Sequence, residues 1–126
     1  MKKVIALIAV LIMIMSIVAV ASAENTSLDL CTKLLTTHEW VYNTNGYVAQ
    51  KGGSLRFDKM LPTIHLPQKN VFVTAGGDGT LYITCIDKDA LYNFATGIIS
   101  FDAEYETMTI LVDTAFAIEV YVYTRK

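Results

Sequence analysis

Hydrophobic residues follow three different spacings along the chain. Over Val4–Val20 they form an almost unbroken run. Over Ser27–Thr36 the apolar residues Leu28, Cys31 and Leu35 recur every three or four positions, as on one face of a helix. Farther along, apolar and polar residues alternate in short stretches that are separated by turn residues. The pattern therefore predicts an apolar leader, one short amphipathic helix and a domain built mainly of β-strands.

The β-rich part divides into about eight predicted strands, as turn residues recur at short intervals. Asn45-Gly46 indicates a tight turn, since both residue types tolerate positive φ. The segment Leu61–Gln68 holds both prolines of the chain and can form only an edge strand or a loop. The main predicted strands are His38–Asn43, Ser54–Lys59, Val71–Thr74, Thr80–Ile86, Ala90–Phe94, Gly97–Asp102, Thr107–Val112 and Phe116–Thr124.

This strand order is typical of an antiparallel meander, and closing the meander into a barrel would remove its exposed edges. A β-sandwich is the alternative. Period-two alternation assigns one apolar face to the interior. The expected interior positions are Trp40, Leu55, Phe57, Leu81, Ile83, Phe101, Ile110, Ile118 and Val120.

The leader has the layout of a secretory signal peptide. Lys2 and Lys3 precede the apolar run, and Ala21-Ser22-Ala23 provides a small-residue cleavage site. We expect residues 1–23 to be removed, which leaves residues 24–126 as a single domain outside the cytoplasm, in the periplasm, at the cell surface or secreted. The alternative is a retained anchor, in which case the leader would be the protein's contact with a membrane.

Charge and cysteine content narrow the function further. The leader holds two lysines and no acidic residue, so its removal lowers the net charge from −2 to −4. An acidic domain without clustered basic residues is not expected to bind nucleic acid or anionic lipid. Cys31 and Cys85 are the two cysteines, and outside the cytoplasm they are expected to form a disulfide, with two buried thiols as the alternative.

Several features resemble the small bacterial lipocalin-like (calycin-type) domains. A short helix is followed by a tryptophan in an early strand (Trp40 in HEWVY), then an S-L-R-F segment, and an aromatic last strand, VYVYTRK, contains Arg125. Glu39 stands where that family commonly has a glycine. The resemblance implies a barrel with an internal cavity, closed at one end by Trp40 and Arg125.

No residue pattern points to catalysis, a metal or a cofactor. His38 and His65 are the only histidines, fewer than a zinc site requires without further ligands. Asp102, Glu104 and Glu106 are interpreted as a solvated acidic loop. Two functions are therefore predicted: a carrier of a small apolar or amphipathic molecule, or a protein-binding or inhibitor module whose exposed aromatic face includes Tyr121 and Tyr123.

Overall fold

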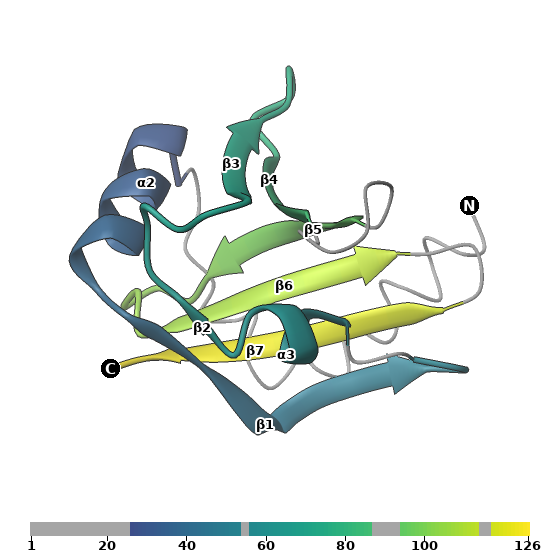
Figure 1. Ribbon diagram of the computed structural model, residues 1–126. Coiled ribbons are helices and arrows are strands. Elements are labelled where there is room, and N and C mark those ends of the chain that lie inside the picture. Colours follow the sequence, from purple (N-terminus) through teal and green to yellow (C-terminus); the bar gives the residue numbers. More distant parts are fainter. Residues whose placement is uncertain (1–25, 54–55, 87–93, 114–116) are drawn as a thin grey trace.

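The computed structural model describes residues 26–53, 56–86, 94–113 and 117–126 (Figure 1). The leader and Leu55 lie outside the described residues. No helix in the described part is long and apolar enough to cross a membrane. The elements are α2 (Leu28–Thr37), β1 (Trp40–Gln50), α3 (Arg56–Met60), β2 (Thr63–Ile64), β3 (Val71–Ala75), β4 (Leu81–Ile86), β5 (Phe94–Phe101), β6 (Thr107–Asp113) and β7 (Ile118–Arg125).

The described part of the chain is mainly β, with seven strands in one curled half-barrel sheet. The strand order is β2-β1-β7-β6-β5-β4-β3, and every neighbouring pair is antiparallel. From β3 to β7 the chain is a simple antiparallel meander, and β1 pairs with the last strand, β7. Strands β2 and β3 are the two edges of this sheet, and in the described residues they do not pair with each other.

Helix α2 packs between these two edges, beside β3 (Figure 1). Its N-cap is Ser27, and the Ser27 Oγ accepts a hydrogen bond from the Leu30 amide at 3.1 Å. The buried face of the helix carries Cys31, Leu34 and Leu35, which confirms the predicted amphipathic pattern. Two hydrogen bonds hold the C-terminal half of α2 against the sheet. The Trp40 Nε1 donates to the Leu34 carbonyl at 3.1 Å, and the Leu66 amide donates to the Leu35 carbonyl at 2.7 Å.

The inner face of the sheet and α2 enclose one main hydrophobic core. Residues Leu81 and Ile83 of β4, Phe101 of β5 and Ile110 of β6 all lie in it, as do Trp40 and Phe57. On β4 the burial alternates strictly along the strand, because its opposite face is open to solvent. Here the period-two pattern of the sequence was sufficient to identify the inner face.

On β7 the predicted faces are wrong. Tyr121 and Tyr123 lie in the main core, opposite Ile110 and Met108 of β6. Ile118 and Val120 point to the other side of the sheet, where they form a second, smaller cluster with Leu111. Both faces of β7 are buried, so hydropathy alone did not distinguish them.

Two local predictions are also wrong. The segment predicted as the strand Ser54–Lys59 overlaps helix α3. Phe57 of α3 and Leu61, which follows it, are buried one turn apart, and the Leu61 amide donates to the Phe57 carbonyl. Phe57 is buried under either spacing, which is why the sequence was ambiguous. Asn45-Gly46 makes no turn, because β1 continues through it with a register shift between Asn43 and Val48. A Cβ on Gly46 would lie 2.5 Å from the Val122 Cβ, so this close crossing of β1 over β7 requires glycine.

The predicted disulfide is absent. Cys31 and Cys85 are free, buried thiols on the inner side of α2 and β4. The sequence showed correctly that each cysteine faces the core, but it contains no information about whether the two sulfur atoms adjoin. Burial raises the pKa of the Cys31 thiol to about 12, so at neutral pH this residue acts as a small apolar side chain.

Candidate functional site

An open cleft of about 520 Å³ lies between the start of α2, the β3–β4 hairpin and the end of β5. Three separate parts of the chain form it, and none of them is close to another in sequence. Its apolar walls include Leu28 of α2, Leu81 of β4, and Ile99 and Phe101 of β5. Because β3 is an edge strand, no further strand covers the cleft on that side.

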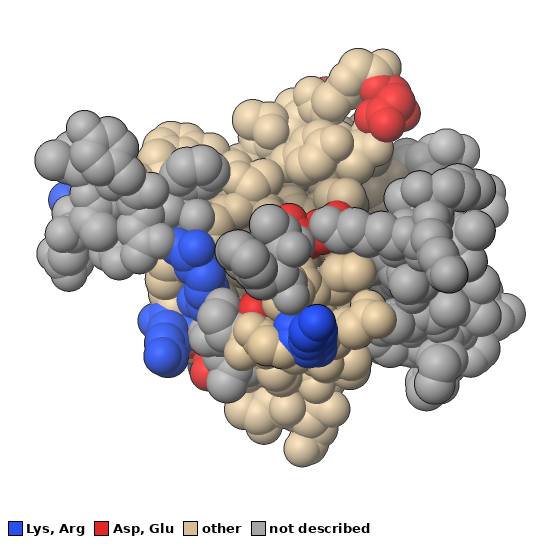
Figure 2. All heavy atoms as spheres, turned by 90° about the vertical axis from the view of Figure 1, so that its right-hand side faces the viewer, with Lys and Arg blue, Asp and Glu red and all other residues tan. Residues whose placement is uncertain are grey.

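The β3–β4 hairpin fixes one wall of the cleft. The Gly76 amide donates to the Thr80 carbonyl at 2.8 Å, and the Gly79 amide donates to the Gly76 carbonyl at 3.0 Å. The Asp78 Oδ1 accepts from the Thr80 amide at 2.9 Å, and this bond lowers the pKa of the Asp78 carboxyl. Gly79 has a φ of +87°, which favours glycine. Figure 2 shows acidic atoms at the top of the view, where the tip of the hairpin lies, while the blue Lys and Arg atoms lie lower in the view.

The floor of the cleft contains two of the residues that the sequence assigned to the interior, Leu81 and Phe101. They are 5% and 2% exposed, so only their edges reach the open space. The Phe101 ring also contacts the Trp40 ring edge-on, with centroids 5.4 Å apart. Phe101 therefore borders the cleft and also packs against the fully buried part of the core.

Polar groups line the same cleft. Ser27, Thr80 and Ser100 contribute to its walls. Thr26 also lines the cleft, and its hydroxyl is a buried side-chain oxygen with no hydrogen-bond partner in the described part of the protein. A buried hydroxyl without a partner costs free energy. The cleft therefore combines apolar walls with polar side chains.

The sequence did not identify the contribution of Thr26, Leu28 and Ile99 to this cleft. Leu28 was interpreted only as part of an apolar helix face, and no pattern singled out Thr26. Their closeness to β5 depends on α2 folding back across the sheet, which no local pattern reports. Ile99 could have been found from its alternation with Phe101, since both point to the inner face of β5.

Four other predicted interior residues lie away from the cleft, in the solid part of the main core. Trp40, Phe57, Ile83 and Ile110 are each 0% exposed. Phe57 contacts the ring of Tyr121 at a centroid distance of 5.5 Å. None of the four lines the cleft, so a molecule bound there would not contact them directly.

The predicted aromatic interaction face is wrong, since Tyr121 and Tyr123 are both 0% exposed. Their rings contact Tyr42, with centroids 6.1 and 5.6 Å away. The Tyr123 hydroxyl donates to the Leu61 carbonyl at 2.6 Å, and the Tyr121 hydroxyl donates to the carboxylate of Glu119, which is itself buried. Burial raises the pKa of both phenols, and in Tyr121 the bond to Glu119 adds to this effect. Each tyrosine places an apolar ring in the core and gives its hydroxyl an internal partner.

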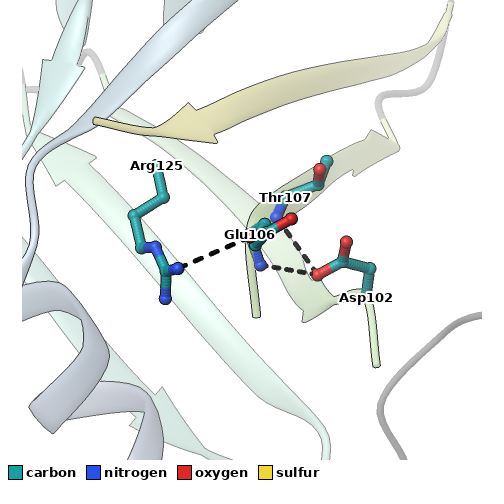
Figure 3. Close-up of polar contacts among 4 residues, drawn as sticks. All are labelled: Asp102, Glu106, Thr107 and Arg125. Carbon is teal, nitrogen blue, oxygen red and sulfur yellow. Dashed lines mark hydrogen bonds and ion pairs between the residues drawn. The ribbon is translucent and has the colours of Figure 1, made fainter. Parts of the chain in front are cut away.

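The acidic run near residue 104 is a structural turn between β5 and β6. The Asp102 Oδ1 accepts hydrogen bonds from the amides of Glu106 at 2.7 Å and Thr107 at 3.1 Å (Figure 3). The Glu106 carboxylate pairs with the Arg125 guanidinium at 3.7 Å. Arg125 lies directly opposite Trp40 in the β1–β7 register, and its guanidinium pairs with the turn.

The described residues contain no group of three or more His, Cys, Asp and Glu side chains that could hold a metal ion. The His65 Nδ1 lies 3.0 Å from the His38 carbonyl oxygen, so the two histidines join segments next to β1 and β2. This contact has a structural explanation.

Comparisons with protein-family models, with curated proteins and with solved structures find no match to this chain.

Proposed function

We propose that this protein binds one small amphipathic molecule in the cleft between α2, the β3–β4 hairpin and β5. The observation that carries the proposal is the cleft itself, with its apolar walls and the buried Thr26 hydroxyl that has no partner. Its volume of about 520 Å³ lies within the range of about 300–1,000 Å³ that small-molecule sites occupy.

The chemistry of the walls favours an amphipathic ligand over a fully apolar one. Leu28, Leu81 and Phe101 offer apolar contact on the floor and one side. Ser27, Thr80 and Ser100 add hydroxyl-bearing side chains to the walls, beside Thr26. A molecule with an apolar body and one hydroxyl, carbonyl or amide group would satisfy both parts.

We also propose that the half-barrel is related to the lipocalin-like barrels. Two observations support this: β1 pairs with the last strand, and Trp40 lies opposite Arg125 at one end of that pair. In this proposal α2 fills the gap between the edge strands β2 and β3, where a closed barrel would have a strand pair. The leader pattern supports the further proposal that the domain acts outside the cytoplasm, and N-terminal sequencing of exported protein should then begin at Glu24.

A protein-binding role is the second candidate. The aromatic face predicted for it is not exposed, because Tyr121 and Tyr123 are buried. An aromatic contact with a partner would have to use Phe72 of β3, which is 53% exposed on the outer face of the sheet. This surface is separate from the cleft, so the two roles can be tested independently.

Titration with an amphipathic fluorescent probe, anilinonaphthalene sulfonate, tests the carrier function. We expect saturable binding to the folded protein with one site per chain. Leu81→Trp should abolish it by filling the cleft, and Ala75→Trp should do the same from an exposed position on the rim. Val41→Trp is the matched control, because Val41 is exposed on β1 and does not line the cleft.

Circular dichroism should show native secondary structure in all three variants. Binding that does not saturate, or that both cleft variants leave unchanged, would contradict the proposed function.

A further inference from the structure

The two edges of the sheet differ in how they are protected. Strand β2 has two residues, Thr63 and Ile64, and prolines flank it at positions 62 and 67. Strand β3, Val71–Ala75, has five residues (VFVTA) with no charge and no proline. Sheets commonly protect their edges with short strands, charges or proline, and β3 has none of these.

The β3–β4 hydrogen bonds show which backbone groups of β3 point outward. The Ile86 amide donates to the Asn70 carbonyl, and the Gly76 amide donates to the Thr80 carbonyl. In an antiparallel pair the bonding residues alternate, so Phe72 and Thr74 bond to β4, while Val73 and Ala75 direct their amides and carbonyls to the open edge. In the described part of the protein these outward groups of Val73 and Ala75 have no hydrogen-bond partner.

Burial differs between the two ends of β3. Val71 is 6% exposed and its amide already donates to the Gln68 carbonyl at 3.2 Å. Thr74 and Ala75 are exposed. The more accessible part of the edge is therefore the half of β3 that leads into the hairpin.

We propose that a second copy of this chain pairs with β3 along this edge, antiparallel and around a two-fold axis at Val73. Outward residues must face outward residues, so Val73 lies opposite Val73 of the second copy and Val71 lies opposite its Ala75. The Val73 residues exchange two hydrogen bonds, and each Ala75 amide donates to a Val71 carbonyl across the axis. The two half-barrel sheets become one continuous sheet.

The charges at the two ends of β3 fit this arrangement. Lys69 precedes the strand, Asp78 follows it, and both are exposed. Antiparallel pairing around Val73 places Lys69 of each copy beside the hairpin tip that carries Asp78 of the other. A parallel arrangement would instead bring like charges together. The same pairing sets the exposed Phe72 opposite Thr74 of the second copy and removes apolar surface from water.

Sedimentation equilibrium of the exported protein over a concentration series tests this pairing. We expect a reversible monomer–dimer equilibrium, with amide hydrogen exchange at Val73 and Ala75 slowing as the concentration rises. Val73→Pro should leave a monomer at every concentration. It removes an amide that points away from β4, so the β3–β4 ladder stays intact, and circular dichroism should be unchanged.

Charge reversal tests the register. Lys69→Glu and Asp78→Lys should each weaken the dimer by about three- to tenfold, because two symmetric pairs become repulsive. The double variant should recover most of the loss. Lys51→Glu, at an exposed lysine outside β3, is the matched control. A protein that stays monomeric throughout the series, a dimer that Val73→Pro leaves intact, or charge variants whose effects simply add would overturn the proposal.

Discussion

The two halves of the inner face are built differently. The closed half, defined here by Trp40, Phe57, Tyr121 and Tyr123, has every side chain fully buried and contains several ring–ring contacts. The open half, defined by Leu28, Leu81, Ile99 and Phe101, borders the 520 Å³ cleft. One half therefore supplies stability, and the other leaves apolar surface available to a ligand.

The difference arises from which elements cover the sheet. Over the closed half, backbone carbonyls accept hydrogen bonds from core side chains. Tyr123 donates to Leu61, which follows α3, and Trp40 donates to Leu34 in the C-terminal part of α2. Over the open half, only the first turn of α2 approaches β5. A helix that crosses the sheet obliquely can fill one end of a half-barrel and leave the other end open.

The largest expected difference between the halves concerns truncation. Trp40→Ala should reduce the free energy of unfolding by about 3–5 kcal/mol, because it leaves a closed cavity and removes the indole bond to Leu34. Leu81→Ala should cost about 2 kcal/mol, near the low end for such a change, because the adjoining cleft already admits solvent. Urea denaturation of both variants measures this. Equal losses would show that the two halves are packed alike.

A smaller effect is expected from the internal tyrosine bond. Tyr123→Phe should destabilise the protein by about 1–3 kcal/mol, because the Leu61 carbonyl loses its donor inside the core. Tyr105→Phe is the matched control, since Tyr105 is only partly buried beside the β5–β6 turn. Thermal unfolding should separate the two variants. Similar melting temperatures would mean that the Tyr123 bond adds nothing to the closed half.

Alkaline pH should weaken the closed half gradually. The pKa of Cys31 rises from 9.0 to about 12 on folding, so the folded state holds the thiol proton more tightly than the unfolded state. Its contribution to stability is complete below pH 9 and is lost as pH rises from there toward about 12, at up to about 1.4 kcal/mol per pH unit. Tyr121 and Tyr123, whose pKa values are also raised, act in the same direction.

Urea denaturation between pH 8 and pH 10.5 should show this decline, and Cys31→Ala should reduce its slope at the start of the range. A thiol reagent should be inert toward the native protein and should modify two thiols after denaturation. Stability that does not change with pH, or a count of zero thiols in the denatured protein, would contradict free, buried cysteines.

The sequence predicted those elements in which one face alone is buried. The apolar spacing of α2, the alternation of β4 and the restriction of the proline-containing segment to an edge strand are all confirmed. Each is a local pattern with a single physical cause. The leader, Leu55 and the carrier function remain predictions.

The errors arose where two causes gave the same pattern. On β7 both faces are apolar, so the neighbouring strand, through the pairing of Tyr121 with Ile110, decides which face is inward. Phe57 is buried in a strand or in a helix, and tertiary packing selected the helix. The cleft depends on contacts between segments about seventy residues apart, near Thr26 and near Phe101, and no local pattern could reveal it.

The most direct test of the account is a titration of methyl-labelled protein with anilinonaphthalene sulfonate, followed by nuclear magnetic resonance. We expect saturable chemical-shift changes and probe-to-methyl contacts at Leu28, Leu81 and Ile99 of the open half. The methyl shifts of Leu61 and Ile110, which lie in the closed half, should not change. Contacts centred on the closed half, or shifts spread evenly over the methyl groups, would contradict the division of the inner face into a packed half and a binding half.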